Sequence, residues 1–447
     1  MLATILLAAS ITLKPCEVRD LKAQCGTLAV PEGKAATRTI DLNIVVLPAP
    51  SKHDDALFVL AGGPGVAATN MAGFANRSFA AGQRDIVLVD ARGTGKSHPL
   101  RCPSDAPLFA DVMDPERLTR CRDELAKTSD LTQYTTLQVV EDLEAVRQAL
   151  GYAKVTLYGT SYGTRVAQEY MRRHPKTTRA VILDGVVPPS FAMPSRYAEN
   201  AQRSFSRVFE LCRAEAACAK AFPDMEFDLA AMTIYAEKGM EIDGAVMKRG
   251  FFGEALRNFL YSPEQYTRLP YVVHAAATNK YQPFAKMATQ YASAIRGLDL
   301  GFFLSVTCAE DIPRLDEAKV RAGAKGTILG AYRLDQQLGA CKVWPRAKSD
   351  AAMREPVRSG IPTLLVSGEL DPVTPPEYGD EVAKTLSHSL HVVIPGGSHA
   401  GDTGGCVEKV ISEFIRKALV DGLDTSCVKA FKRPAFVTSE DASAQTK

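Results

Sequence analysis

The decisive stretch of this sequence reads Leu157-Tyr158-Gly159-Thr160-Ser161-Tyr162-Gly163-Thr164. An apolar strand pattern over residues 154–157 leads into it, and a helical pattern over residues 165–173 follows it. A nucleophile elbow requires this strand, turn and helix, because small residues two positions on either side of a serine let the chain turn tightly. The N-terminus of the following helix directs N–H groups toward developing negative charge. Ser161 is therefore the candidate nucleophile, and the alternative is a glycine-rich turn with an incidental serine.

Strands and helices alternate on both sides of this stretch. Short apolar runs at residues 56–60, 85–90 and 179–186 are typical of strands buried on both faces. Apolar positions within residues 136–150 form a helical stripe that can pack on a sheet. The alternation predicts a mainly parallel sheet flanked by helices, and the pattern of residues 39–47 adds antiparallel strands at its edge.

The strand rhythm is interrupted by a long, largely helical region that begins after Pro188-Pro189. It resumes with the apolar run that starts at Ile361. We expect a large helical cap inserted between core strands. The predicted parts are a first core segment, the cap, a second core segment and a polar, frayed tail, at residues 14–189, 190–357, 358–427 and 428–447.

The N-terminal residues 1–13 form a short apolar run with small residues near its end, which predicts a secretory signal, although a basic start is missing. The alternative is a first β-strand. No later segment reaches the roughly 20 apolar residues of a spanning helix, so we expect no stable membrane insertion after signal removal. The net charge of +2, without a basic stripe, argues against a nucleic-acid partner.

Ten cysteines, an even number, support export to the periplasm or the exterior. Sequence alone cannot fix connectivity, and pairing in sequence order is our prediction. No Cys-x-x-Cys spacing occurs, so we expect no zinc site, and nothing else in the sequence calls for a metal or cofactor. The predicted disulfides are Cys16–Cys25, Cys102–Cys121, Cys212–Cys218, Cys308–Cys341 and Cys406–Cys427.

Two further residues stand at predicted strand ends in an informative order. Asp371 follows the strand at residues 363–366, and His399 follows the strand at residues 391–394. An α/β-hydrolase orders its triad as Ser, then Asp or Glu, then His, on loops at the carboxyl ends of strands. His399 would take the proton of Ser161, and Asp371 would orient the imidazole. The alternatives are Glu369 as the acid and a surface-loop role for the histidine.

The tetrahedral intermediate of such a reaction needs hydrogen-bond donors for its oxyanion. The Tyr162 N–H, directly after the nucleophile, is one candidate. The other is the Gly63 N–H in the loop Gly62-Gly63-Pro64-Gly65, where glycines permit close approach of the backbone. The alternative for this loop is a simple turn after a strand.

Two other patterns invite misreading. Gly95-Lys96-Ser97 is similar to the end of a phosphate-binding loop, but Asp90 occupies the position where that motif needs its first glycine. His388 and His391 are too isolated for a metal site.

In combination, the motifs resemble the prolyl iminopeptidase and tripeptidyl aminopeptidase family of α/β-hydrolases, and the C-terminal portion is similar to the tripeptidyl branch. One departure is Ala61, where many relatives have histidine. The resemblance rests on Gly62-Gly63-Pro64-Gly65, Asp90-Ala91-Arg92-Gly93-Thr94-Gly95-Lys96-Ser97, Gly159-Thr160-Ser161-Tyr162-Gly163, Asp371-Pro372-Val373-Thr374-Pro375 and Gly397-Ser398-His399.

The resemblance implies an exported enzyme that hydrolyses peptides from a free N-terminus, with acidic cap residues binding the substrate ammonium. Glu310 is the first candidate for that role and Asp311 the second, because a Cys308–Cys341 disulfide would hold them rigidly. A helix-capping or solvated acidic pair is the structural alternative. Two other functions stay open: a carboxylesterase or lipase-like enzyme with the same triad, and a non-catalytic binding protein on a hydrolase fold.

Overall fold

The computed structural model describes residues 11–33, 38–103, 105–242, 244–400 and 405–439. Most of the predicted signal segment, residues 1–10, lies outside this part of the chain. Of its remainder, Ile11 and Leu13 pack against the hydrophobic core.

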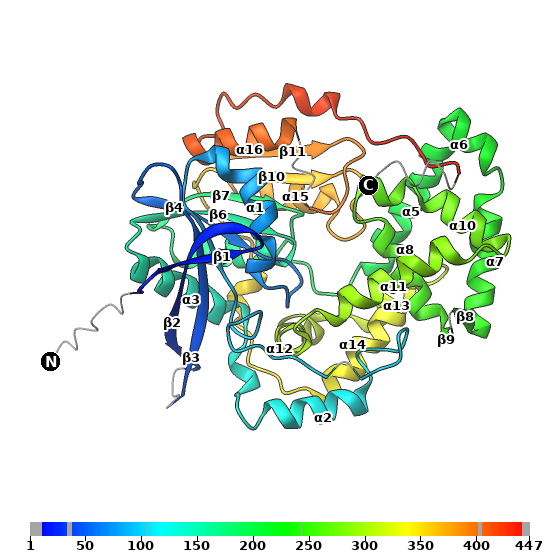
Figure 1. Ribbon diagram of the computed structural model, residues 1–447, viewed down its shortest axis with the longest axis horizontal. Helices are drawn as coiled ribbons and strands as arrows, with labels where there is room; N and C mark the ends of the chain where they lie inside the picture. The colour runs from blue at the N-terminus through cyan, green and yellow to red at the C-terminus, as the bar shows by residue number, and fades with distance from the viewer. Residues whose placement is uncertain (1–10, 34–37, 104, 243, 401–404, 440–447) are drawn as a thin grey trace.

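A mixed, mainly parallel sheet forms the centre of the molecule (Figure 1). Within the described residues it contains nine strands in the order β1-β2-β3-β5-β4-β6-β7-β10-β11. The pairs β1–β2, β2–β3 and β3–β5 are antiparallel, and all later neighbours are parallel, as predicted. The bounds are β1 Lys14–Val18, β2 Leu21–Pro31, β3 Thr39–Leu47, β4 Asp55–Leu60, β5 Ile86–Val89, β6 Lys154–Thr160, β7 Thr178–Asp184, β10 Thr363–Gly368 and β11 Ser389–Ile394.

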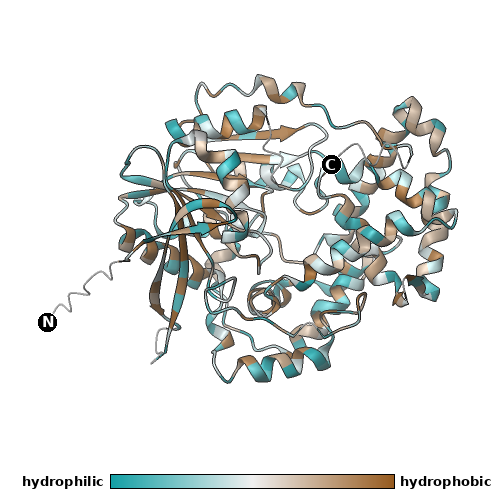
Figure 2. Cartoon of the chain, in the orientation of Figure 1, coloured by the Kyte–Doolittle hydropathy of each residue, from teal (hydrophilic) through white to brown (hydrophobic). Residues whose placement is uncertain are grey.

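The two faces of the sheet are buried under different helices, which explains the continuous apolar runs of the parallel strands. In β4, Phe58 and Leu60 join the hydrophobic cluster beneath α3 (Thr136–Leu150) and α4 (Tyr162–Arg173). Leu57 and Val59 point the other way, into the cluster beneath α1 (Ala72–Phe79) and α16 (Cys406–Lys417). Figure 2 shows hydrophobic residues along these central strands. Each fully buried Leu or Phe contributes about 1.5–3 kcal/mol relative to exposure.

The cap is inserted between β7 and β10, as the interrupted strand rhythm predicts. It is mostly helical, with one small hairpin, β8 (Met240–Ile242) and β9 (Ala245–Met247). Its helices are α5 Tyr197–Ala214, α6 Ala216–Ala221, α7 Met225–Lys238, α8 Arg249–Phe259, α9 Pro263–Tyr266, α10 Leu269–Ala277, α11 Gln282–Arg296, α12 Leu300–Glu310, α13 Glu317–Ala324 and α14 Tyr332–Val343. The remaining core helices are α2 Pro115–Leu125 and α15 Pro376–Ala383.

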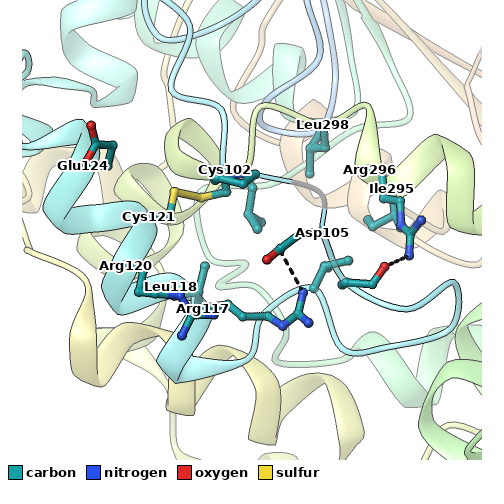
Figure 3. A pocket seen from close by; sticks show the side chains of 14 residues that line it. Cys102, Asp105, Arg117, Leu118, Arg120, Cys121, Glu124, Ile295, Arg296 and Leu298 are labelled. Carbon is teal, nitrogen blue, oxygen red and sulfur yellow. Dashed lines mark hydrogen bonds and ion pairs between the residues drawn. A yellow bond between two sulfur atoms is a disulfide. The ribbon is translucent and has the colours of Figure 1, made fainter.

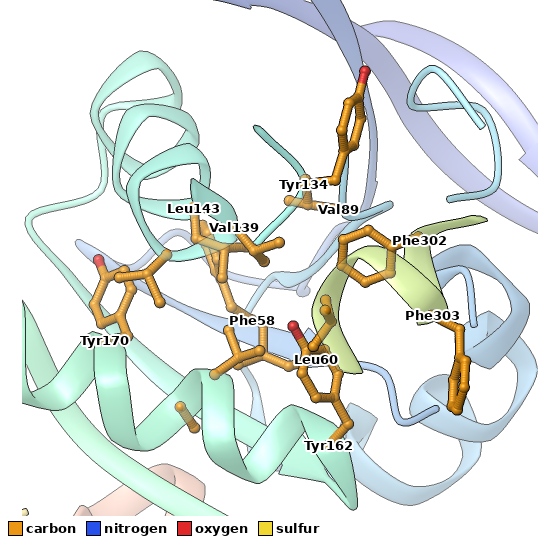
Figure 4. Close-up of a cluster of buried hydrophobic side chains, with 14 of the residues drawn as sticks. Phe58, Leu60, Val89, Tyr134, Val139, Leu143, Tyr162, Tyr170, Phe302 and Phe303 are labelled. Atoms are coloured by element: carbon orange, nitrogen blue, oxygen red, sulfur yellow. The ribbon is translucent and has the colours of Figure 1, made fainter. Parts of the chain in front are cut away.

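The cap is less separate than the sequence indicates. Helices α5 to α11 share a hydrophobic cluster of their own. Helix α12 instead belongs to the cluster of the sheet, where its Phe302 lies close to Leu60 and Tyr162 (Figure 4). Every residue of α12, from Leu300 to Glu310, is buried, so the helix is covered on all of its sides. Helix α12 therefore links the cap to the core directly above the elbow.

The described part of the predicted frayed tail, residues 428–439, is packed on the protein, and residues 440–447 lie outside the described part of the chain. Beyond Cys427 the chain passes over the cap, and its residues Phe436 and Val437 are buried. The Phe436 N–H donates to Glu215, and Arg433 forms an ion pair with the same carboxylate at 2.8 Å. The segment is polar enough to suggest fraying, but its few apolar residues meet a matching cap surface.

All ten cysteines lie in the described residues and form the five predicted pairs. Five disulfides fit an oxidising compartment.

Among the helices of the described chain, none is by itself long and apolar enough to cross a membrane. Helix α11 and residues 300–314 together pass the test of length and composition, but the two are bent by 76° relative to each other. The same part of the chain holds no group of three or more His, Cys, Asp or Glu residues placed to bind a metal ion.

Candidate active site

Ser161 occupies a strained turn between β6 and α4. Its φ and ψ are 53° and −119°, a conformation that residues other than glycine rarely adopt. Two contacts hold it there: its N–H donates to the Asp184 carbonyl at 2.9 Å, and its own carbonyl accepts from the Thr164 hydroxyl at 2.6 Å. The sequence-predicted elbow is thus present as a strand, a sharp turn and a helix.

The glycines of the elbow are required by the space around them. A Cβ on Gly159 would lie 2.4 Å from the Gly163 carbonyl oxygen, and a Cβ on Gly163 would lie 2.2 Å from the Leu60 carbonyl oxygen. Both distances are far shorter than any tolerable contact. The Gly-x-Ser-x-Gly pattern is therefore a packing requirement between β6, α4 and β4.

Asp371 and His399 are brought together by the parallel pair β10 and β11, whose carboxyl ends meet at one sheet edge. The His399 Nδ1 lies 3.0 and 2.9 Å from the two Asp371 oxygens. The carboxylate is fully buried and also accepts from the Val373 N–H, the Thr374 N–H and the Thr374 hydroxyl. Burial raises the pKa of Asp371, but the adjacent His399 charge and these hydrogen bonds outweigh it, so its pKa is lowered.

His399 and Ser161 share one short stretch of backbone, Asp184-Gly185. Asp184 accepts the Ser161 N–H, and a Cβ on Gly185 would lie 3.4 Å from the His399 Cε1. On its other side, the His399 ring packs edge-on against Tyr261, with centroids 5.0 Å apart. Within the described residues the Ser161 hydroxyl makes no hydrogen bond, and such catalytic contacts often tighten only when substrate binds.

The glycine loop after β4 lies against the nucleophile. A Cβ on Gly62 would be 3.1 Å from the Ser161 Cβ, and Gly63 has a φ of 106° that favours glycine. Among the described residues, the N–H groups of Gly63 and Tyr162 have no acceptor. A cavity of about 30 Å³ adjoins the loop and is mostly apolar, with Gly62, Tyr162 and Phe302 in its wall.

The discounted alternatives have other partners. The Glu369 carboxylate accepts the Gly396 N–H and pairs with Arg207, so it does not contact His399. His391 lies between Asp380 and Ser367. Lys96 donates its backbone N–H to Asp90, which makes that loop a folded turn.

Glu310 and Asp311, the acids that the family resemblance implies as ammonium ligands, are engaged within the protein. Both side chains are buried. Glu310 accepts the Thr136 N–H at 2.8 Å and the Thr136 hydroxyl at 2.6 Å, and Arg165 pairs with Asp311 at 2.9 Å. Burial raises the pKa of Glu310 to about 7, although Arg165 and the Thr136 hydrogen bonds act against it. The geometry is that of a cap on α3 and a brace for α4, and the role of these acids as ammonium ligands stays a prediction.

The sequence analysis missed a polar cluster in the cap. Glu254 is buried; its Oε2 accepts from the Tyr197 hydroxyl at 2.6 Å, whereas its Oε1 has no hydrogen-bond partner in the described chain. Arg257 lies one turn further along α8, over the Tyr197 ring, and is also 5.2 Å from the Tyr261 centroid. The available signal was the presence of two charged residues in the run Phe251 to Phe259, whose other members apart from Asn258 are apolar or glycine.

A larger cavity, of about 290 Å³, lies elsewhere, beside α2 and the Cys102–Cys121 disulfide (Figure 3). No predicted catalytic residue lines it. Arg117 in its wall pairs with Asp105, and Arg296 donates to backbone carbonyls (Figure 3). These two arginines thus have internal partners, and the predicted catalytic residues lie at the elbow instead.

The sheet, the elbow and the Asp371–His399 pair define a hydrolase architecture, and sequence comparison agrees. Residues 55–401 match the family described as alpha/beta hydrolase fold, and because this is more than half of the chain, the protein belongs to that family. Serine protease Hip1 of Mycobacterium tuberculosis is similar, with 27% identity over 459 aligned residues that cover 88% of this chain and 85% of that protein.

Two further proteins are similar to this chain. Carboxylesterase B of Mycobacterium tuberculosis is 26% identical over 441 residues, which cover 88% of this chain and 84% of that protein. Among solved structures, the proline iminopeptidase of Mycobacterium smegmatis aligns with 88% of this chain and 98% of its own at 17% identity, with a TM-score of 0.43.

Proposed function

We propose that the protein is an exported serine peptidase that cleaves peptides from a free N-terminus through an acyl-enzyme on Ser161. The observation that carries the proposal is the buried Asp371–His399 pair beside Asp184-Gly185, the same stretch that holds the Ser161 N–H. The five disulfides support export. The similarity to a protein named as a serine protease, over most of both chains, supports peptide substrates.

The proposed reaction begins with proton transfer from the Ser161 hydroxyl to the His399 Nε2. With Nδ1 donating to Asp371, the other ring nitrogen is left as the acceptor that a general base needs. The buried Asp371 carboxylate then stabilises the imidazolium, and its lowered pKa keeps it ionised. His399 returns the proton to the leaving amine, and a water molecule, activated in the same way, hydrolyses the acyl-enzyme.

The oxyanion would be bound by the N–H groups of Tyr162 and Gly63, neither of which has an acceptor in the described chain. Each donor of this type contributes about 10²–10³ in kcat. The position of Gly62 against the Ser161 Cβ supports this, since it brings the loop to the reacting atom.

Glu254 is a further candidate for the substrate ammonium ligand, beside Glu310 and Asp311. Its Oε1 is a buried acceptor without a partner in the described chain, and Tyr197 fixes the other oxygen. A charge-assisted hydrogen bond from an ammonium would satisfy it. We expect Glu254→Gln to reduce kcat/KM for free-amine peptides more than for their N-acetylated forms. Equal reductions would contradict this role.

The first experiment is labelling with a fluorophosphonate probe. We expect stoichiometric labelling of the wild-type protein, no labelling of Ser161→Ala, and unchanged labelling of Ser293→Ala, which alters an exposed cap serine that bonds only to Thr289. Folded wild-type protein that does not react would contradict the catalytic proposal and favour a binding protein.

A carboxylesterase is the second candidate, because a protein of that name is similar over equally much of the chain. The same Ser161 chemistry serves both functions, so labelling does not separate them. The discriminating measurement compares short peptide p-nitroanilides with free amines, their N-acetylated forms, and p-nitrophenyl esters. Faster turnover of the esters, with no effect of acetylation, would favour the esterase.

A further inference from the structure

Two arginines, Arg257 on α8 and Arg333 on α14, meet inside the cap. Their guanidinium carbons lie 3.9 and 5.5 Å from the centroid of the same Tyr197 ring, so the two positive charges lie near one another. The Nε atoms of both side chains are buried and have no hydrogen-bond partner in the part of the chain that is described. No ion pair to either arginine occurs there.

Such an arrangement is unfavourable unless an anion completes it. Arginine does not lose its proton in proteins, so both guanidiniums stay charged. A buried charge without a partner is strongly destabilising, and contact with an aromatic face does not satisfy the N–H donors. The neighbouring side-chain amide of Gln337, on the same helix face as Arg333, is likewise without a partner among the described residues.

The acidic groups nearby do not neutralise the pair directly. The Glu254 charge acts on both guanidiniums and favours their charged form, but in the described chain it forms no ion pair with either, and its Oε2 accepts from the hydroxyls of Tyr197 and, at 3.4 Å, Tyr291. The charge of Asp111 reaches Arg333, but its Oδ1 accepts the Met113 N–H and the side chain of Gln336, and burial raises its pKa.

Contacts connect this cluster to the active site on two sides. Arg257 lies over the Tyr261 ring, which packs against His399. Arg333 lies 5.3 Å from the centroid of Phe303, on the helix α12 that covers the elbow (Figure 4). A group bound to these arginines would therefore be separated from His399 by the Tyr261 ring.

We propose that Arg257 and Arg333 bind a carboxylate of the substrate, so that the enzyme selects short peptides that carry this group. The inference rests on the proposed peptidase function. A carboxylate accepts two parallel hydrogen bonds from a guanidinium, which matches the unused donors. A substrate ammonium bound to Glu254 without a carboxylate would place a third positive charge beside the two arginines. A substrate that carries both an ammonium and a carboxylate leaves the net charge of the cluster unchanged.

The carboxylate can be the side chain of an acidic N-terminal residue or the C-terminal group of a short peptide. Two matched substrate pairs separate these sources. The first pair is Glu-Ala-Ala and Gln-Ala-Ala p-nitroanilide, and the second is tetra-alanine with a free or an amidated C-terminus, followed by mass spectrometry. In one of these two pairs, we expect the kcat/KM of the substrate with the carboxylate to be about 30-fold higher than that of its neutral partner. The pair that shows this difference identifies the source of the carboxylate.

The variants are Arg257→Gln and Arg333→Gln, with Arg249→Gln as the matched control. Arg249 lies at the start of the same helix and pairs with Glu237 at the surface. Both test variants should lose most of the carboxylate preference while cleaving the neutral partner substrate within about threefold of the wild type, and the control should keep the preference. Because the test variants remove an unpaired buried charge, we expect their Tm not to fall.

Three results would overturn the inference. They are no carboxylate preference in the wild type, a preference that persists in both variants, and an equal loss on all substrates together with a lowered Tm. The last would make the arginines structural. Fluorophosphonate labelling of Ser161 in the same preparations separates failure of this inference from failure of the proposed catalysis. A thermal shift by glutarate, absent with glutaramide and absent in the variants, would support the anion site independently of turnover.

Discussion

Replacement of Asp371 by asparagine tests the catalytic assignment most directly. The substitution keeps the shape of a fully buried side chain and leaves an oxygen to accept the N–H groups of Val373 and Thr374. What changes is the atom opposite His399: an amide N–H₂ there would donate to Nδ1 and force the proton onto Nε2. The imidazole would then offer Ser161 a donor in place of the required acceptor.

The expected effect is large on catalysis and small on folding. Loss of the correct tautomer lowers kcat by about 10⁴, equivalent to about 5 kcal/mol of transition-state stabilisation. For stability, the hydroxyl of Thr374 loses an acceptor at 2.7 Å but can rotate, so the free energy of unfolding should fall by about 1–2 kcal/mol.

The assay measures kcat and kcat/KM on a free-amine peptide p-nitroanilide, alongside urea unfolding of the same samples. Glu369→Gln is the control, because Glu369 lies in the same loop but bonds to Gly396 and Arg207. We expect it to keep activity within about threefold of the wild type. Activity of Asp371→Asn above about a tenth of the wild-type value, or a greater loss in Glu369→Gln, would refute the assignment.

Three further predictions concern stability. The pKa of Glu310 is raised to about 7, so folding favours its protonated form and the free energy of unfolding should fall by up to about 3 kcal/mol as pH rises from about 4.5 to about 7; Glu310→Gln should flatten this slope in urea titrations, and an unchanged slope would contradict the burial argument. Gly163→Ala should cost about 3 kcal/mol or more, because its Cβ would lie 2.2 Å from an oxygen of β4, whereas Gly73→Ala meets only the end of a flexible arginine at 3.4 Å and should be neutral or slightly stabilising. Removal of the Cys308–Cys341 disulfide by a double alanine substitution should lower the free energy of unfolding by about 4 kcal/mol, given its sequence separation of 33, and urea unfolding of the variant beside the oxidised wild-type protein checks this value.

The parallel half of the fold could be predicted because its signals are local. Strand β4 is apolar at every position since both of its faces are covered, and the elbow carries glycines where any Cβ would collide. The order of Ser161, Asp371 and His399 is also visible in the sequence, because each follows its own strand. The disulfides could be predicted because each joins cysteines that are neighbours in the sequence.

The contacts that the sequence did not predict join residues that are remote in sequence. Glu310 looks like a free acid, but Thr136 and Arg165, more than a hundred positions away, occupy it. The tail looks polar, yet Val437 donates its N–H to the Thr267 carbonyl in the cap. Burial of a charged side chain depends on which surface folds over it, and no local periodicity reports that.

The contrast between local signals and remote contacts also separates the proposed catalytic residues from the residues proposed to select the substrate. The proposed acyl transfer needs groups held within about 0.5 Å, and the shared edge of a parallel sheet would supply that precision to Asp371 and His399. The cap site instead joins Tyr197, Arg257 and Arg333 from three helices, so it can change without disturbing the sheet. Two proteins are almost equally similar to this chain, and one is named a serine protease and the other a carboxylesterase. This is consistent with substrate choice that changes more readily than the sheet. Substitutions in the arginine pair should therefore alter which substrate is cleaved, while substitutions at Asp371 should slow every substrate alike.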